Sequence, residues 1–219
     1  MATKPLRRFQ NRRFLHFLAA FYALVWIITA IRPIDRGDWL IENLLVFAAV
    51  PVLILTYRRL PLSDMSYLLL AIFLALHAIG AHYTYAKVPL GDWMKQALAW
   101  DRNHFDRLVH CLFGLLLLAP VREVLVRTVH ARGFWSYALP FTVIVSASGF
   151  FEIVEAIVAQ IVSPELGTAY LGTQGDQWDA QKDMAVAAAG AAFAIVLVAA
   201  IAATRGRKIP DDEIRRSAR

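Results

Sequence analysis

Several features that identify common classes of soluble enzyme are absent from this sequence. Its single cysteine, Cys111, excludes an intramolecular disulfide and a paired-thiol redox motif. There is no GxGxxG, Walker A or GxSxG motif, so nucleotide binding and serine-hydrolase chemistry are not leading hypotheses. The HExxH motif of zinc proteases is also absent, and no internal repeat is evident. Function must therefore be sought in polar residues that have unusual surroundings.

Charged residues are scarce as well, at 18% of the chain, whereas 58% of the residues are hydrophobic and the mean hydropathy is +0.50. This composition is typical of an integral membrane protein. A transmembrane helix needs about 20 apolar residues to cross about 30 Å of hydrocarbon. We therefore predict an all-α fold, a single polytopic transmembrane bundle of six helices over residues 1–219. Its spans should cover residues 14–31, 39–57, 67–85, 108–126, 134–161 and 184–204.

Three segments between or after these runs have patterns of their own. Residues 91–100 interleave tryptophans with polar side chains, which is typical of a short amphipathic helix at the membrane interface. Residues 163–177 contain no basic residue and are expected to form a connecting loop. Residues 205–219 form a polar C-terminal tail.

The formal net charge of +6 raises the question of nucleic-acid binding. The basic residues are spread over short connecting segments instead of one patch, so no nucleic-acid partner is expected. Most Lys and Arg residues lie in the N-terminal segment, the second and fourth connections and the C-terminal tail. Cytoplasmic segments of membrane proteins carry such an excess, which predicts a multi-pass protein with both termini in the cytoplasm.

Ionisable residues in the outer halves of the apolar runs are candidate site residues, because burying them in hydrocarbon is unfavourable without a partner or a cavity. His82 lies near the outer end of the third run, and His77 lies near its middle. For His77, a structural hydrogen bond to a neighbouring helix and a functional role are equally good interpretations. In the fourth run Asp106 precedes His110 by one helical turn, where a carboxylate can orient an imidazole. Arg107 offers a planar fork for a carboxylate or phosphate.

The last two runs add carboxylates to this set. Glu152 and Glu155 are three residues apart, and two such groups in a low dielectric need a cation, a shared proton or an arginine between them. The segment GTQGDQWDAQKD then places Asp176, Asp179 and Asp183 on one face of a helix. Asp176 is expected to cap that helix above the site.

Folding the helical hairpins back brings these groups to one depth on the extracytoplasmic side. Carboxylate and imidazole ligands together suit zinc, manganese or iron. Glu42, in the second run, is a candidate outer member of the same site. We predict catalytic roles for His82, Asp106, Arg107 and His110, and a divalent metal ion bound by His110, Glu152, Glu155, Asp179 and Asp183.

Four segments of the sequence carry a resemblance to a known family: GAHYTYAKVPLGDW, RNHFDRLVHCLFGLLLLAPVREVL, FFEIVEA and LGTQGDQWDAQKDM. Their order and spacing over residues 66–195 resemble the bacterial inner-membrane family that includes YjdF and, more distantly, the VanZ-like membrane proteins. The resemblance implies a membrane fold in the bacterial inner (plasma) membrane, but no particular activity. Lys182 stands where a bulkier aromatic residue is expected in relatives.

Three functions are compatible with this pattern. The leading hypothesis is a metal-dependent membrane hydrolase that faces the extracytoplasmic side and acts on a lipid or lipid-linked substrate, with membrane lipids as its partners. An alternative is a proton- or cation-coupled transporter of a small solute, because intramembrane acids often serve as relays. A third is a non-catalytic membrane scaffold in which the polar cluster locks the bundle.

Overall fold

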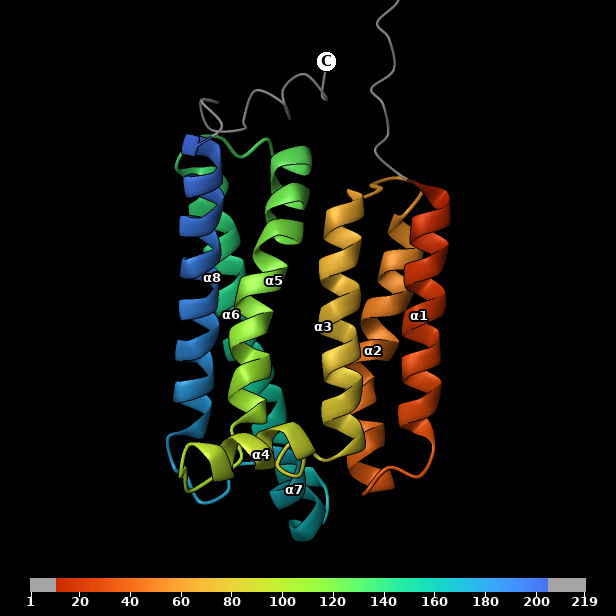
Figure 1. Ribbon diagram of the computed structural model, residues 1–219, viewed down its shortest axis with the longest axis vertical. Coiled ribbons are helices and arrows are strands. Elements are labelled where there is room, and N and C mark those ends of the chain that lie inside the picture. Colours follow the sequence, from red (N-terminus) through yellow and green to blue (C-terminus); the bar gives the residue numbers. More distant parts are fainter. Residues whose placement is uncertain (1–10, 205–219) are drawn as a thin grey trace, which may run out of the picture.

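The computed structural model describes residues 11–204, which form eight helices (Figure 1). No strand occurs in this part of the chain. Six helices are long and apolar enough to cross a membrane, which confirms the predicted all-helical fold. The predicted polar tail, residues 205–219, lies outside the described residues. The long helices are α1 (Arg12–Ala30), α2 (Arg36–Thr56), α3 (Asp64–His82), α5 (Phe105–Thr128), α6 (Trp135–Ile161) and α8 (Asp179–Thr204).

Two short helices lie between the long ones. Helix α4 (Pro89–Ala97) occupies most of the segment predicted to be an interfacial helix. Helix α7 (Pro164–Leu171) corrects the expectation of a plain loop at residues 163–177. It begins because the Ser163 side chain accepts a hydrogen bond from the Leu166 backbone and Pro164 favours the first helical position. It ends at Gly172, whose left-handed backbone (φ 59°) suits glycine.

Helices α5 and α8 begin earlier than hydropathy predicts, at Phe105 and Asp179 instead of residues 108 and 184. Their first turns are polar, so a search for apolar runs misses them although the backbone is already helical. Asp106 and Asp183 project from regular helices, as their spacing predicts, whereas Asp176 precedes α8 instead of belonging to it. Rigid elements hold side chains more accurately than loops do.

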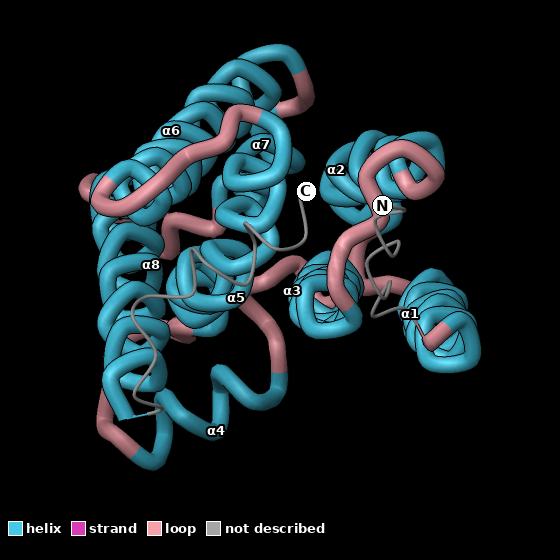
Figure 2. The backbone as a smooth tube through the Cα atoms, turned by 90° about the horizontal axis from the view of Figure 1, so that it is seen from above, coloured by secondary structure: helices cyan, strands magenta, loops and turns pink. Residues whose placement is uncertain are grey.

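The long helices form two layers (Figures 1 and 2). Helices α8, α5, α3 and α1 follow one another in a row, and α6 and α2 both lie on one side of that row, with α7 between them in the view of Figure 2. Helices α4 and α7 both lie at the end of the bundle where α3 ends and where α5 and α8 begin. We call this the α4/α7 end, and the polar cluster described below lies there.

Helices α5 and α8 approach each other unusually closely because glycines face backbone atoms across the contact. A Cβ atom added to Gly114 would collide with the Ala187 carbonyl oxygen, and one added to Gly190 would collide with the Cys111 carbonyl oxygen. Ala187 and Ala191 are completely buried between the two helices. Small residues permit such approach in membrane helices, where close packing is a main source of association.

The first residues of α1 and the last residues of α8 lie at the same end of the bundle, opposite α4 and α7 (Figure 1). An even number of membrane crossings requires this arrangement. Much of the charge bias behind the predicted orientation lies in residues 1–10 and 205–219, outside the described part. The cytoplasmic placement of both termini therefore stays a prediction.

Replacing Gly114 by alanine should destabilise the protein, because the added methyl group meets the backbone of α8. We expect the free energy of unfolding to fall by about 1–3 kcal/mol, as in other overpacked sites. Thermal unfolding in detergent measures this as a lower Tm. Gly149→Ala is the matched control, because its Cβ would meet only the flexible Met184 sulfur, at 3.2 Å. Equal Tm values for the two variants would contradict the role assigned to the α5–α8 contact.

Candidate functional site

Two arginines bind the acidic segment that leads into α8. Arg102 Nη1 donates to Asp179 Oδ1 at 2.5 Å, and its Nη2 donates to Asp179 Oδ2 at 3.3 Å. Arg107 Nη2 donates to the same Asp179 oxygen at 2.9 Å and to Asp176 Oδ2 at 2.5 Å. Lys182 Nζ donates to that Asp176 oxygen at 2.6 Å. Charge-assisted pairs of this kind fix geometry as well as charge.

Arg102 is the functional residue that sequence reasoning missed. It lies in the connection before α5 and looked like an ordinary loop residue, but its side chain is buried. The segments before α5 and α8 are joined around it. Arg102 Nη1 also donates to the Thr173 carbonyl at 3.0 Å, and Asn103 and Gln174 exchange two further hydrogen bonds. The contact between Arg102 and Asp179 depends on two connecting segments that meet in space, so no local sequence pattern predicts it.

Asp176 and Asp179 are therefore structural partners of arginines. Asp176 also acts near the start of α8 as expected, because its Oδ1 accepts from the Trp178 backbone at 3.1 Å. Arg107, which was predicted to bind a carboxylate or phosphate, is engaged by carboxylates of its own chain. Asp179 has both oxygens engaged by arginine, so we leave it out of the metal site proposed below.

A second group of side chains lies next to these ion pairs. Asp106 and His110 on α5 and Asp183 on α8 each offer one ligand atom, and the three atoms lie within 4.8 Å of one another. His110 Nε2 is 3.7 Å from Asp106 Oδ1 and 3.5 Å from Glu152 Oε1 on α6. The close contact between α5 and α8 brings the first three together. We call Asp106, His110, Asp183 and Glu152 the acid–histidine cluster.

The distances in the acid–histidine cluster suit a metal ion. Ligands at about 2.1 Å from a tetrahedral metal ion lie about 3.4 Å from one another. Both separations measured from His110 Nε2 are close to this value. Glu152 Oε1 and Asp183 Oδ1 are buried and have no hydrogen-bond partner among the described residues, although Asp183 Oδ1 lies 3.8 Å from Arg107 Nε. Buried carboxylate oxygens without partners are unfavourable, and a cation would satisfy them.

Glu155 lies one turn further along α6. Unlike Glu152, Glu155 lines the adjoining cavity. The predicted pair is thus divided between the acid–histidine cluster and the cavity wall.

A cavity of about 440 Å³ opens beside the acid–histidine cluster. Helices α2, α3, α5, α6 and α7 all contribute to its walls. Most of the wall is apolar, and the polar side chains gather toward the α4/α7 end. This volume is in the usual range for small-molecule sites. The ionisable lining residues are Glu42, His77, Tyr85, Asp106, His110, Glu155 and Tyr170.

His77 is held in one neutral tautomer by its neighbours. Its Nε2 lies 3.0 Å from the Glu42 carbonyl oxygen, which can only accept, so Nε2 carries the proton. Its Nδ1 therefore accepts from the Tyr85 hydroxyl at 2.5 Å. The structural interpretation of His77, a hydrogen bond to a neighbouring helix, describes this arrangement, while the ring also lines the cavity.

Tyr85 reaches His77 through a tightly bent turn after α3. Thr84 and Tyr85 both have positive φ values, 55° and 47°, which are unfavourable for residues other than glycine. The turn folds the Tyr85 ring directly over Gly80, where any added Cβ would overlap the ring. Burial, with Glu42 nearby, raises the pKa of the Tyr85 hydroxyl well above its ordinary value. The hydroxyl therefore stays protonated and keeps donating to His77.

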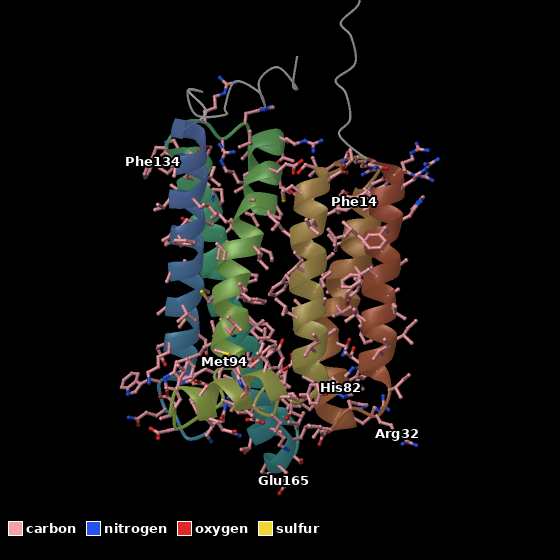
Figure 3. All side chains as sticks on the ribbon, viewed as in Figure 1. Phe14, Arg32, His82, Met94, Phe134 and Glu165 are labelled. Carbon is pink, nitrogen blue, oxygen red and sulfur yellow. The ribbon has the colours of Figure 1, made fainter. Side chains whose placement is uncertain are left out.

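His82 does not join the other predicted site residues. Its Nδ1 lies 2.8 Å from the Thr29 carbonyl oxygen on α1, at the end of α3 (Figure 3). Glu42 on α2, treated from sequence as an outer member, is almost fully buried and lines the cavity. Asp38, one turn earlier on α2, is also buried, and neither of its oxygens has a hydrogen-bond partner among the described residues.

Comparisons with known proteins place the sequence in a family. Residues 14–204 match the family model described as "Predicted membrane protein (DUF2238)". The sequence is 36% identical over 186 residues to "Inner membrane protein YjdF" of Escherichia coli (strain K12), covering 84% of this chain and 88% of that protein. This confirms the resemblance to the family that includes YjdF, while the likeness to VanZ-like proteins stays a prediction. No solved structure matches the chain.

The ion pairs around Asp176 predict a specific acid sensitivity. Hydrogen bonds from Lys182 and Arg107 lower the pKa of Asp176 below its ordinary value of 3.8. Its stabilising effect is therefore complete above pH 3.8 and is lost as the pH falls further toward the folded-state value. We expect Asp176→Asn to lower the Tm at pH 7, and the difference from wild type to shrink below pH 3.8. Thermal unfolding at several pH values in detergent measures both.

Asp101→Asn is the control for this experiment, because Asp101 is an exposed acid in the connection before α5. Its Tm should follow that of the wild type at each pH. A Tm difference between Asp176→Asn and wild type that stayed constant from pH 7 to pH 3 would show that the carboxylate does not act through its charge. Since these ion pairs are partly exposed, high salt should reduce the effect.

Proposed function

The chain belongs to the DUF2238 family of predicted membrane proteins, and within that membrane framework we propose that it is a metal-dependent hydrolase acting on a lipid or lipid-linked substrate. The observation that carries this proposal is the position of the acid–histidine cluster at the wall of a largely apolar cavity. Asp106 and His110 belong both to the cluster and to the cavity lining. A bound metal ion and a substrate in the cavity would thus be neighbours.

In this proposal Asp106, His110 and Asp183 bind the metal ion, and Glu152 is the fourth protein ligand. A divalent metal ion in such a site supplies Lewis acidity and makes a bound water more acidic. Glu155 faces the cavity and is positioned to exchange a proton with the substrate. Arg102 and Arg107 act at a distance from the chemistry, because they fix the segment that leads into α8 and hence the position of Asp183.

We also propose that the site faces the extracytoplasmic side of the bacterial inner membrane. The Lys and Arg distribution supports this orientation. The relative from Escherichia coli, which is described as an inner membrane protein, supports the membrane itself. A hydrolase at this depth would meet its substrate from the lipid phase or from the outer surface.

The polar groups at the opposite end of the bundle favour an enzyme over a transporter. Glu123 on α5 accepts hydrogen bonds from the Ser63 backbone, from the hydroxyls of Ser63 and Ser66, and from Arg127. These groups satisfy one another. Between them and the acid–histidine cluster lie apolar residues such as Leu118 and Ile144, both almost completely buried. A relay across the membrane needs polar groups along its whole length.

Elemental analysis of the purified, detergent-solubilised protein tests the proposal. The wild type, after incubation with zinc or manganese and removal of the excess, should retain about one metal ion per chain. Asp183→Asn and Asp106→Asn should each lower the affinity by a factor of about 10–100 or more, since each replaces an anionic ligand by a neutral amide. Glu165→Gln, on the exposed face of α7, is the matched control and should retain the metal.

Two results would contradict the proposal. Equal trace amounts of metal in the wild type and both cluster variants would show that the acid–histidine cluster binds no metal ion. If the only effect of the cluster variants were a lower Tm, the cluster would serve to stabilise the helix bundle, as in the scaffold hypothesis. Metal-independent, pH-driven uptake by proteoliposomes that was lost in Glu155→Gln would favour the transporter instead.

A further inference from the structure

The α2 wall of the cavity carries a carboxyl group that the proposed metal site does not use. Glu42 is only 4% exposed and lines the cavity, yet its Oε2 has no hydrogen-bond partner among the described residues. The metal ligands lie on α5, α6 and α8, whereas Glu42 lies on α2. Glu42 therefore belongs to a separate wall. A buried, unpartnered acid that faces a cavity indicates a ligand that donates a hydrogen bond or carries positive charge.

The charges around the cavity favour a cation over an anion. Among the described lining residues, Glu42 and Glu155 carry carboxyl groups outside the proposed metal site, Asp106 carries one within it, and none is a lysine or arginine. The nearby guanidinium groups of Arg102 and Arg107 do not line the cavity and are engaged by Asp176 and Asp179, and Asp106 is the lining acid that feels their charge. His77 stays neutral because its Nδ1 accepts from Tyr85. An anionic headgroup would therefore be repelled.

Aromatic rings surround the same polar region. Tyr85, Tyr170 and Phe151 line the cavity together with Glu42 and Glu155. Both tyrosines are within electrostatic reach of these two acids. Aromatic faces attract ammonium groups, and the attraction is stronger where water is excluded. Acids and aromatic rings together form the type of pocket that recognises an organic cation.

The rest of the cavity suits a hydrocarbon chain. From Glu42 the lining continues along α2 to Ala48, which is about 9 Å of helix, and from Glu155 it continues along α6 to Ala147, which is about 12 Å. Leu44 and Phe150 also line the cavity, although they are 57% and 68% exposed. The cavity therefore opens between α2 and α6 on the outer surface of the bundle, the surface that faces lipid. Both helices lie on the same side of the helix row (Figure 2).

We infer that the cavity binds an amphiphile with a positively charged amine headgroup, with the ammonium against Glu42 and Glu155 and the chain in the apolar part that opens between α2 and α6. Such an amphiphile would be the substrate class of the proposed hydrolase, and the claim that it is hydrolysed rests on that proposed function. Binding itself does not need the metal ion, because Glu42 lies outside the acid–histidine cluster.

Three probes with the same chain test the inference: hexadecylamine, hexadecanol and hexadecanoate. They are titrated into the full-length protein in maltoside micelles at pH 7, where the amine is protonated, and affinity is read from the rise in Tm. We expect hexadecylamine to bind at least about tenfold more tightly than hexadecanol, and hexadecanoate to bind least. Equal affinity for amine and alcohol, or preference for the carboxylate, would overturn the inference.

Glu42→Gln should lose at least about tenfold of the hexadecylamine affinity while its weaker affinity for hexadecanol is unchanged. Glu165→Gln removes the same charge from the exposed tip of α7 (Figure 3) and should behave as the wild type. Unchanged amine binding in Glu42→Gln would reject the site. If that variant does not fold, Ala48→Trp decides, because it fills the apolar part and keeps every charge. It should weaken binding of hexadecylamine, and undiminished binding would overturn the inference.

The same titration with EDTA separates this inference from the proposed function. Amine preference that persists in EDTA is the expected result, and its disappearance would contradict the assignment to Glu42. If the protein prefers the amine but binds no metal, the proposed hydrolase is rejected and the amine site stands. If it binds metal without preferring the amine, the hydrolase stands and this inference is rejected.

Discussion

The close backbone contact between α5 and α8 is the constraint on which the arrangement of the site depends. Gly114 and Gly190 allow each helix to lie against carbonyl oxygens of the other. Two helices at ordinary distance, with larger side chains between them, would separate the ligand atoms of α5 from those of α8. The distance between Asp183 and the two α5 residues Asp106 and His110 is therefore set one to two turns away, by glycines that offer no functional side chain.

Several charged groups lie buried or partly buried near this contact, and they fall into two sets with different means of stabilisation. Asp176 and Asp179 are satisfied within the chain by Arg102, Arg107 and Lys182. The acid–histidine cluster and Glu42 contain oxygens that accept no hydrogen bond in the described residues. A fully paired set rigidifies a structure, whereas unpaired buried acids are unfavourable unless a ligand, proton or ion satisfies them. The first set therefore holds the segments of the site in place, and the second set contains the groups that would bind a ligand or ion.

The sequence was sufficient to predict the six long apolar helices, because nearly every face of these helices is apolar and hydropathy alone reveals them. It also predicted that Asp106, His110, Glu152 and Asp183 share one depth, since depth follows from counting residues along each helix. Rotation and lateral position could not be derived in this way. His82 turns toward α1, and Glu42 enters the cavity from α2, because the weak amphipathicity of these helices does not indicate which face meets a neighbour. Arg102 and α7 depend on how connecting segments fold back, which hydropathy does not describe.

The central claim is that a metal ion binds between α5, α6 and α8. X-ray absorption spectroscopy of the zinc-loaded protein tests it most directly, because it reports the atoms bound to the metal. The account predicts four nitrogen and oxygen ligands at about 2.0–2.2 Å with the multiple-scattering signal of one imidazole, and loss of that imidazole signal in His110→Ala. A spectrum of hydrated zinc, or an imidazole signal that His110→Ala leaves unchanged, would contradict it.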